Sequence, residues 1–406
     1  MSIRNLLFIA MVITIAACTA STPEPSPALD RLPTPANTST PTSAPSITPS
    51  STPLPRPTVT PSPTPPPIPK PDIGVQGQFI GPAGDKGIEQ AADLGVGWIK
   101  QQIDWNSVEY ARGLYRWGEI DHVVAQAKAR GLKILFSVAR APGFSRSEPV
   151  EEDGPPNDFT IFHDFMHALS TRYKGSVAAY ELWNEPNLRR EWRGFDLSAE
   201  KFVELIKQGA AGVREGDPGA IIISGAPGTT GIDDKVNAID DRVYLRAMLA
   251  AGVGDLVDAI GAHPYGAANP PDERAADAAH KASGFNHHPS FFFLDTLEDY
   301  HAILSEANVN RPIWITEAGW PSIEHFGSVD TTGWEYAREV TEADQAAYLM
   351  RALQLRRDRA WIGPLIIWNL NIAPLSGPGR PESAYGLLRP DGSRRPAYQQ
   401  LRNSGE

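Results

Sequence analysis

Two glutamates follow apolar runs at positions where buried strands should end, and together they could perform acid–base and nucleophilic chemistry. Glu185 lies in the segment 183–187, which reads WNEPN and follows a short apolar run. Glu317 follows a β-branched run that begins at Ile313, and a glycine-containing turn comes after it. If the two strands are parallel and close into one barrel, both carboxylates reach the same mouth. A carboxylate pair of this kind is what the cleavage of a glycosidic bond requires.

The elements that must position these glutamates alternate, after Asp72, between short apolar runs and longer amphipathic segments. We expect strands at 73–79, 97–103 and 132–138, in the run before Glu185, at 220–224 and 257–262, in the run before Glu317, and at 364–368. We expect helices at 86–94, 117–130, 158–173, 199–215, 242–251, 291–307, 342–357 and 396–401. This alternation is typical of a parallel α/β sheet, and about eight strand–helix units predict a (β/α)8 TIM barrel over residues 73–406. An open doubly wound sheet is the alternative, but no Gly-x-Gly-x-x-Gly turn follows the first strand.

Alternate residues of a strand point the same way, so the sequence also predicts which side chains share a face. Glu181, Trp183 and Glu185 would share one face, and Ile313, Ile315 and Glu317 would share another. We therefore expect Glu185 and Glu317 to be inward-pointing residues at the strand tips. Glu181 lies one strand step below the mouth, where we expect a structural partner inside the barrel.

The motifs around Glu185 and Glu317 resemble those of clan A glycoside hydrolases, the retaining superfamily whose catalytic glutamates follow the fourth and seventh barrel strands. The segments 113–117 (GLYRW) and 141–144 (APGF) are most similar to family 39, with family 5-like proteins as neighbours. The resemblance covers essentially all of residues 73–406. It implies that Glu185 is the general acid/base and Glu317 the nucleophile, and that neither a metal nor an organic cofactor is needed.

The resemblance also implies a set of residues that contact the sugar. Asn184 would hydrogen-bond the sugar 2-hydroxyl beside the nucleophile. His263 and Tyr265 match a His-x-Tyr pattern on the sixth strand, and Tyr265 would contact Glu317. Trp368 matches the eighth-strand tryptophan that forms the floor of the subsite next to the scissile bond.

Further candidates for substrate binding come from the expected second and third strands and from the loops. Many clan members have an arginine where this chain has Lys100 and a histidine where it has Arg140, so the sugar subsite departs from the family pattern there. The second strand also carries Gln102. Trp105 and Trp320 lie in expected strand-to-helix loops, where aromatic faces can stack on sugars.

The N-terminal part of the chain predicts export and a tether. Arg4 precedes an apolar stretch that is too short to span a bilayer, so residues 1–17 are typical of a signal peptide. They end in Ile-Ala-Ala before Cys18, which is the only cysteine, and this resembles the lipobox of bacterial lipoproteins. Residues 18–72 are rich in Pro, Ser and Thr with almost no aromatics, which predicts a disordered linker. We expect an extracytoplasmic, lipid-anchored protein; a cleaved signal with a chance cysteine is the alternative.

Charge and composition exclude some classes of partner. The formal net charge is −11 and no basic run occurs, which argues against a nucleic-acid partner. His287 and His288 have no neighbouring ligand residues in the sequence, so we expect no metal site there. We expect a monomer.

The function predicted from the residues and the resemblance is a retaining glycoside hydrolase that cleaves β-glycosidic bonds in polysaccharide or oligosaccharide at the cell surface. A single glutamate at a strand end can simply cap a helix or pair with an arginine, but two in these motifs favour catalysis. An exo-acting β-xylosidase-like or transglycosylating enzyme would use the same residues. A non-catalytic carbohydrate-binding lipoprotein that kept the barrel is the alternative from another class.

Overall fold

A computed structural model describes residues 70–147, 153–277 and 287–404 of the chain. The predicted signal peptide, Cys18 and nearly all of the predicted linker lie outside the described residues. Within those three ranges, no helix is both long enough and apolar enough to cross a membrane.

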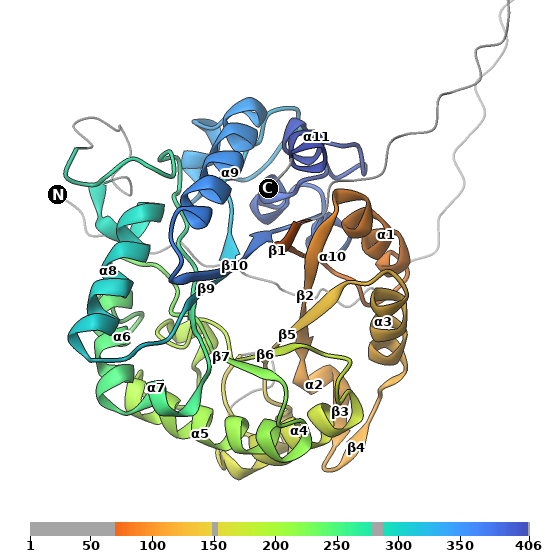
Figure 1. Ribbon diagram of the computed structural model, residues 1–406, viewed down its shortest axis with the longest axis vertical. Coiled ribbons are helices and arrows are strands. Elements are labelled where there is room, and N and C mark those ends of the chain that lie inside the picture. The colour runs from red at the N-terminus through yellow and green to blue at the C-terminus, as the bar shows by residue number, and fades with distance from the viewer. Residues whose placement is uncertain (1–69, 148–152, 278–286, 405–406) are drawn as a thin grey trace, which may run out of the picture. The chain divides into compact units, whose positions relative to one another are not determined.

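Eight parallel strands form the centre of the fold (Figure 1). They are β1 (Lys70–Gln76), β2 (Val96–Asp104), β5 (Lys133–Ala139), β6 (Ala179–Leu182), β7 (Ile221–Ser224), β8 (Ile260–Ala262), β9 (Ile313–Ala318) and β10 (Ile362–Trp368). Their order in the sheet is β7-β6-β5-β2-β1-β10-β9-β8. Parallel bridges between Ile223 and Ala259 and between Gly228 and His263 join the two ends of this sheet. The expected (β/α)8 barrel is therefore confirmed.

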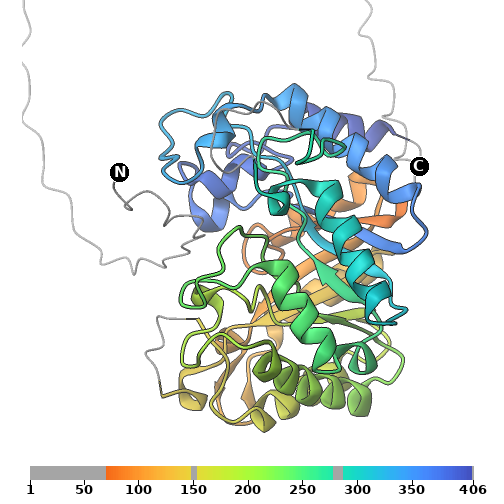
Figure 2. The ribbon, with the colours of Figure 1, turned by 90° about the vertical axis from the view of Figure 1, so that its left-hand side faces the viewer.

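Helices surround the strands on all sides in Figure 1, and Figure 2 shows α6 and α8 lying in front of them. The longer helices are α1 (Gly84–Leu94), α3 (Gly118–Ala129), α4 (Thr160–Arg172), α5 (Ala199–Gly216), α6 (Asp241–Ala250), α8 (Phe293–Glu306), α9 (Glu342–Arg357) and α11 (Pro396–Asn403). The short ones are α2 (Trp105–Val108), α7 (Val253–Leu256), α10 (Ala373–Ser376) and the 3₁₀ turns η2 (Gly143–Ser145), η3 (Arg189–Glu191), η5 (Pro289–Phe291), η6 (Glu335–Arg338) and η7 (Pro381–Tyr385). Each longer helix coincides with a predicted one.

Local sequence signals account for several helix ends. Ser198 precedes α5, and its side chain accepts a hydrogen bond from the Lys201 amide. Thr341 and Asp344 form a reciprocal capping box at the start of α9. Gly95 adopts the left-handed conformation (φ 74°) that ends α1.

A small hairpin of β3 (Glu109–Ala111) and β4 (Leu114–Tyr115) follows β2 and was not predicted from the sequence. Gly113 makes its turn with φ 72°. Strands of three and two residues are too short to give a recognisable alternation of apolar and polar residues. The hairpin precedes α3 and leaves the order of barrel elements unchanged.

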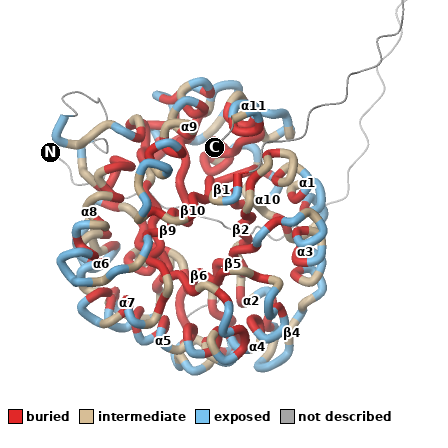
Figure 3. Tube along the Cα trace, viewed as in Figure 1, coloured by how far each residue is buried: buried red, intermediate tan, exposed pale blue. Residues whose placement is uncertain are grey.

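The interior of the barrel changes from apolar to polar along the strands. One buried cluster draws its members from the strands around the ring: Trp98, Leu135, Ala179, Ile223, Ala259, Trp314 and Ile366. The next residues on the same inner face lie two positions further along the strands. They are Lys100, Ser137, Glu181, Thr316 and Trp368. All five are buried, as are most residues of the barrel strands in Figure 3. The apolar layer thus supports a largely polar layer beneath the carboxyl-terminal mouth.

Candidate active site

A β-bulge in β9 turns Glu317 into the mouth of the barrel. Leu365 and Ile367 of β10 pair with Ile315 and Ala318 of β9, so β9 has one residue more than β10 in this stretch. The extra residue interrupts the regular alternation of the strand, and bulges of this kind redirect side chains beside active sites. Glu317 therefore reaches the mouth although Trp314, with the opposite parity, is the residue that lies inside the barrel.

This corrects the expectation that Ile313 and Ile315 point inward with Glu317. Both isoleucines belong to the cluster that packs the strands against the surrounding helices. The prediction was wrong because it extended regular strand alternation through the bulge.

The backbone around Glu185 also leaves the regular strand conformation. β6 ends at Leu182, and Trp183 (φ 79°) and Glu185 (φ 40°) are both in the left-handed region. For a residue as bulky as tryptophan this conformation is strained, and such strain is concentrated at functional sites. Trp183 does not share a face with Glu185 as expected, because its ring packs against Phe162 and Trp192 at centroid distances of 6.0 and 6.1 Å.

Two donors hold the carboxylate of Glu317. Lys100 Nζ lies 3.1 Å from Glu317 Oε1, and the Tyr265 hydroxyl donates to Oε2 at 2.8 Å. Lys100 also lies 2.8 Å from Glu181 Oε2, and both of these side chains are fully buried. Although burial alone would lower it, the two carboxylates raise the pKa of Lys100, which keeps the ammonium charged beside Glu317.

Lys100 therefore does not meet the expectation of a sugar contact. Its ammonium is enclosed by carboxylates and by the Thr316 carbonyl oxygen, which accepts from it at 3.2 Å. The lysine positions Glu317 instead. Glu181 lies inside the barrel as a structural partner, in agreement with its place on the strand.

Glu185 is held by different partners. His263 Nδ1 lies 3.0 Å from Glu185 Oε1, and the Arg190 guanidinium forms an ion pair with Oε2. Burial would raise the pKa of Glu185, but the charge of Arg190 and the hydrogen bond with His263 lower it to about 2. Glu185 is therefore ionised in this arrangement.

His263 connects the two glutamates. Its Nδ1 atom, 3.0 Å from Glu185 Oε1, lies 3.8 Å from Glu317 Oε2, and the imidazole is fully buried. Burial alone would lower the pKa of His263, but the carboxylates of Glu317 and Glu185 raise it. The two carboxylates, from strands far apart in sequence, thus approach one ring nitrogen.

Aromatic side chains line the same mouth. Tyr265 lies edge to face with Trp368 at 6.0 Å, and Tyr385 packs against both rings at 5.7 and 5.0 Å. The Tyr385 hydroxyl is 3.0 Å from that of Tyr336. Tyr385 was not predicted from the sequence, because it lies in η7, well beyond the strand that ends at Trp368.

Two tryptophans predicted to contact sugar lie elsewhere. Trp105 is fully buried, stacks on Phe165 at 5.0 Å and donates its ring N–H to Glu109 at 2.6 Å. Trp320 is also fully buried and donates to the Asn269 carbonyl oxygen at 2.8 Å. Both stabilise the loops around the barrel, and neither presents a ring face to a ligand.

The remaining predicted residues lie near the carboxyl ends of β2, β5 and β6. Gln102 donates to Asp104 at 2.9 Å, and Arg140 lies 3.4 Å from Asp104 and 3.2 Å from Asp153. Asn184 Oδ1 is buried and, among the described residues, has no hydrogen-bond partner. An unpaired buried acceptor beside Glu185 is available to a ligand hydroxyl.

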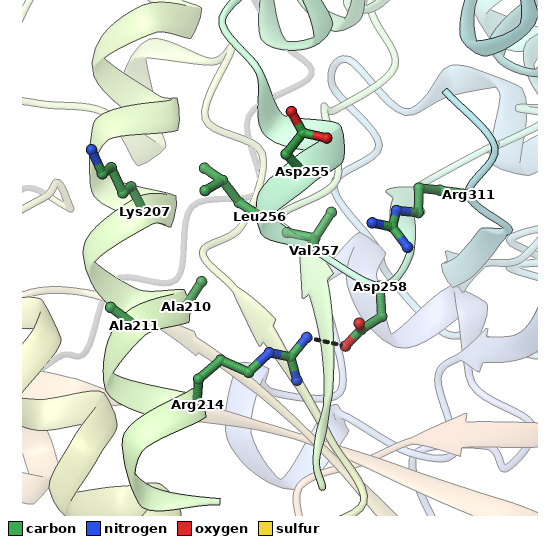
Figure 4. A pocket seen from close by; sticks show the side chains of 9 residues that line it. All are labelled: Lys207, Ala210, Ala211, Arg214, Asp255, Leu256, Val257, Asp258 and Arg311. Atoms are coloured by element: carbon green, nitrogen blue, oxygen red, sulfur yellow. Dashed lines mark hydrogen bonds and ion pairs between the residues drawn. The ribbon is translucent and has the colours of Figure 1, made fainter. Parts of the chain in front are cut away.

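A separate hollow of about 300 Å³ lies at the other end of the barrel (Figure 4). It is lined by α5, α7 and the segment before β8, and an ion pair joins two of the lining residues, Arg214 and Asp258, at 2.6 Å. Val257 and Asp258 precede β8, whereas Glu185 and Glu317 stand at the carboxyl ends of their strands. In TIM barrels the amino-terminal end contributes to stability rather than to catalysis. The part of the chain that the structure describes contains no group of three or more His, Cys, Asp or Glu residues that could hold a metal ion.

The chain resembles known proteins in sequence and in fold. No protein-family model matches the chain. Over 203 residues it is 26% identical to endo-1,4-beta-xylanase 3 of Hypocrea jecorina, an alignment that covers 46% of this chain and 56% of the xylanase. The chain thus spans about half the length of the curated relative that it matches.

Three solved structures share the architecture. A family 39 glycoside hydrolase from Bacteroides cellulosilyticus WH2 gives a TM-score of 0.61 at 21% identity over 83% of this chain and 65% of that one. GH5_18 from Streptomyces cattleya gives 0.57 at 14% identity, over 82% and 79%. A psychrophilic family 10 endo-β-1,4-xylanase gives 0.53 at 16% identity, over 83% and 97%. The chain shares the (β/α)8 barrel fold of these glycoside hydrolases. The resemblance predicted from the motifs at Glu185 and Glu317 is confirmed at this level.

Proposed function

We propose that this protein is a retaining glycoside hydrolase that cleaves β-linked polysaccharide or oligosaccharide. The observation that carries the proposal is the approach of Glu185 and Glu317 to one atom, His263 Nδ1, at 3.0 and 3.8 Å. Retaining enzymes need their two carboxyl groups about 5–5.5 Å apart, whereas inverting enzymes leave about 6.5–9.5 Å for a water molecule. The close pair supports the retaining arrangement.

In the proposed reaction, Glu317 attacks the anomeric carbon while Glu185 gives its proton to the leaving oxygen. The glycosidic bond breaks and a covalent ester to Glu317 forms. Glu185, now ionised, takes a proton from water, whose oxygen attacks the same carbon and releases the sugar from Glu317. Each group returns to its starting state, so the net reaction is hydrolysis with retained configuration.

The partners of Glu317 fit the nucleophile's role. Lys100 and Tyr265 donate to its two oxygens, which orients the carboxylate. The ring of neighbouring Trp368 would stack on the sugar bound at the mouth. Asn184 Oδ1 would accept a hydrogen bond from a sugar hydroxyl.

The experiment that tests this function measures reducing ends released by the full chain from β-glucans, xylans, mannans and galactans. The Glu317→Gln variant should lose activity by roughly 10³-fold or more, because it lacks the nucleophile. Glu339→Gln, at an exposed residue, is the matched control and should remain active. A 2-fluoro glycoside with a good leaving group should label Glu317, and mass spectrometry of the peptide would locate the label.

The products also separate the alternatives. Internal cleavage gives oligosaccharides, exo-action gives single sugars, and transglycosylation gives longer chains. Binding of a glycan by the folded chain without any bond cleavage would contradict the hydrolase proposal and support a binding protein.

We further propose that the enzyme is held outside the cytoplasm by a lipid on Cys18. The support is the sequence Ile-Ala-Ala before the chain's only cysteine and the Pro, Ser and Thr-rich residues that follow. Mass spectrometry of the mature N-terminus tests this proposal, and a first residue other than lipidated Cys18 would contradict it.

A further inference from the structure

Arg190 bridges the proposed acid/base and a second carboxylate. It lies in η3, close to the barrel mouth, and its Nη2 atom pairs with Glu185 Oε2. Its Nε atom lies 3.4 Å from Glu191 Oε1. The side chains of Glu185 and Glu191 are only 10% and 14% exposed, so one guanidinium neutralises two carboxylates that are shielded from water.

This arrangement suits only one half of the proposed reaction. A guanidinium beside Glu185 favours the ionised carboxylate, which is the form that accepts a proton from water in the second step. The first step needs the protonated carboxyl, and a proton on Glu185 would leave the charge of Arg190 without its closest counter-charge. Glu191 is the neighbouring group that can receive that charge.

We propose that Arg190 alternates between Glu185 and Glu191 during the catalytic cycle. It pairs with Glu191 while Glu185 carries the proton for the leaving group, and it returns to Glu185 when that carboxylate is ionised. Arg190 is thus a positioning residue, and this inference rests on the proposed hydrolase function.

The charges around the bridge allow this exchange. Burial, together with the nearby carboxylates of Glu185 and Asp153, raises the pKa of Glu191 to about 7, against the opposing effect of Arg190. Glu191 can therefore ionise near neutral pH and attract the guanidinium.

Groups on four other elements face the same bridge. His263, at the end of β8, holds the other oxygen of Glu185 and lies near Glu317 on β9. Arg140, from the end of β5, acts on Glu191, and Glu382, from η7, acts on Arg190. Burial raises the pKa of Glu382. None of these groups is changed by the variants chosen below.

Substitutions of Arg190 and of Glu191, both in η3, should shift the pKa of the acid/base Glu185 in opposite directions. Arg190→Gln removes the cation that opposes protonation, so the alkaline limb of the kcat/KM profile should move to higher pH by about one unit or more. Glu191→Gln removes a carboxylate that competes with Glu185 for Arg190, so Glu185 retains the guanidinium and the limb should move to lower pH. Arg190→Lys keeps the charge and should stay near the parent.

The test uses the full chain and its variants with an unactivated β-glycoside and with a dinitrophenyl glycoside. The dinitrophenolate leaves without help from an acid, so the shifts should be seen with the first substrate and be much reduced with the second. Shifts of both variants in the same direction, or no shift within about 0.3 pH unit, would overturn the exchange.

A ¹³C NMR titration of the Glu185 carboxyl measures its protonation directly and so tests the same exchange without an activity assay. Its midpoint should rise in Arg190→Gln and fall in Glu191→Gln, and an unchanged midpoint in both would refute the proposal. If the midpoints move as expected but the parent chain cleaves no glycoside, the hydrolase function fails, and only the link between the Arg190 charge and the protonation of Glu185 stands.

Discussion

The ammonium of Lys100 lies 3.1 Å from Glu317 Oε1, although the two residues are 217 positions apart in the sequence. Lys100 is also 2.8 Å from Glu181, so one buried cation joins a carboxylate inside the barrel to the carboxylate at its mouth. The proposed nucleophile is therefore fixed to the polar layer of the barrel interior.

Replacing Lys100 with methionine should destabilise the fold strongly. The change leaves Glu181 and Glu317 as buried carboxylates without their cation, and breaking a buried pair in this way costs about 3–5 kcal/mol. The free energy of unfolding in urea measures it. Lys174→Met, at an exposed residue, is the control and should change stability by less than about 0.5 kcal/mol. Adding Glu181→Gln to Lys100→Met should recover part of the loss, and a Lys100→Met variant as stable as the parent would contradict the argument.

Replacing Tyr265 with phenylalanine should slow catalysis without unfolding the protein. The Tyr265 hydroxyl donates to Glu317 at 2.8 Å, and burial raises the pKa of Tyr265 well above its ordinary value, so the donor keeps its proton. Hydrogen bonds to charged groups contribute about 1.5–3 kcal/mol, which corresponds to a fall in kcat/KM of roughly 10- to 150-fold. Tyr348→Phe, on α9, is the control. Equal kcat/KM values for both variants would show that the Tyr265 hydroxyl does not act on the nucleophile.

The sequence predicted the barrel because periodicity and strand–helix alternation are local signals. Helices such as α5 and α9 carry clear caps, and their predicted bounds agree with the structure to within one residue at each end. Glu185 and Glu317 were predicted to be the catalytic pair because each follows an apolar run in a distinctive motif.

Side-chain direction at the two motifs could not be predicted from alternation. The β9 bulge and the left-handed φ of Trp183 break the regular period, and both depend on contacts with neighbouring strands and helices. Tertiary contacts also decide that Trp105 and Trp320 are buried and that Arg190 approaches Glu185. The sequence shows only that an aromatic or charged residue lies nearby.

Replacing Glu191 with glutamine should stabilise the protein at alkaline pH. The pKa of Glu191 is about 7 in the folded chain, above the ordinary value of 4.5. Between these values the folded chain binds more protons than the unfolded chain, so ionisation of Glu191 lowers stability as the pH rises. The variant should therefore have a higher Tm than the parent at pH 8 and nearly the same Tm at pH 4. Glu204→Gln, at an exposed residue, is the control. The same Tm difference at both pH values would contradict the predicted titration.

Replacing Gly74 with alanine should destabilise the barrel from inside. A Cβ atom at Gly74 would collide with Ile366 Cδ1 and would lie 2.8 Å from Trp98 Cβ, both in the apolar layer of the interior. Overpacking of this kind costs about 1–3 kcal/mol, measured as the free energy of unfolding in urea. Gly118→Ala is the matched control, because a Cβ there meets no atom within 4 Å and α3 begins at this residue.

The clash at Gly74 can be relieved by shortening its neighbour. Ile366→Val removes the Cδ1 atom that the new methyl group meets, so the double variant should be more stable than Gly74→Ala alone. Ile366→Val in the parent should instead destabilise the fold by about 0.5–1.5 kcal/mol. The isoleucine Cδ1 fills the space beside Gly74, and the valine would leave that space empty. The two substitutions must then be non-additive. If their effects simply add, the side chains at positions 74 and 366 do not compete for the same space, and the layered barrel interior described above is wrong at its first strand.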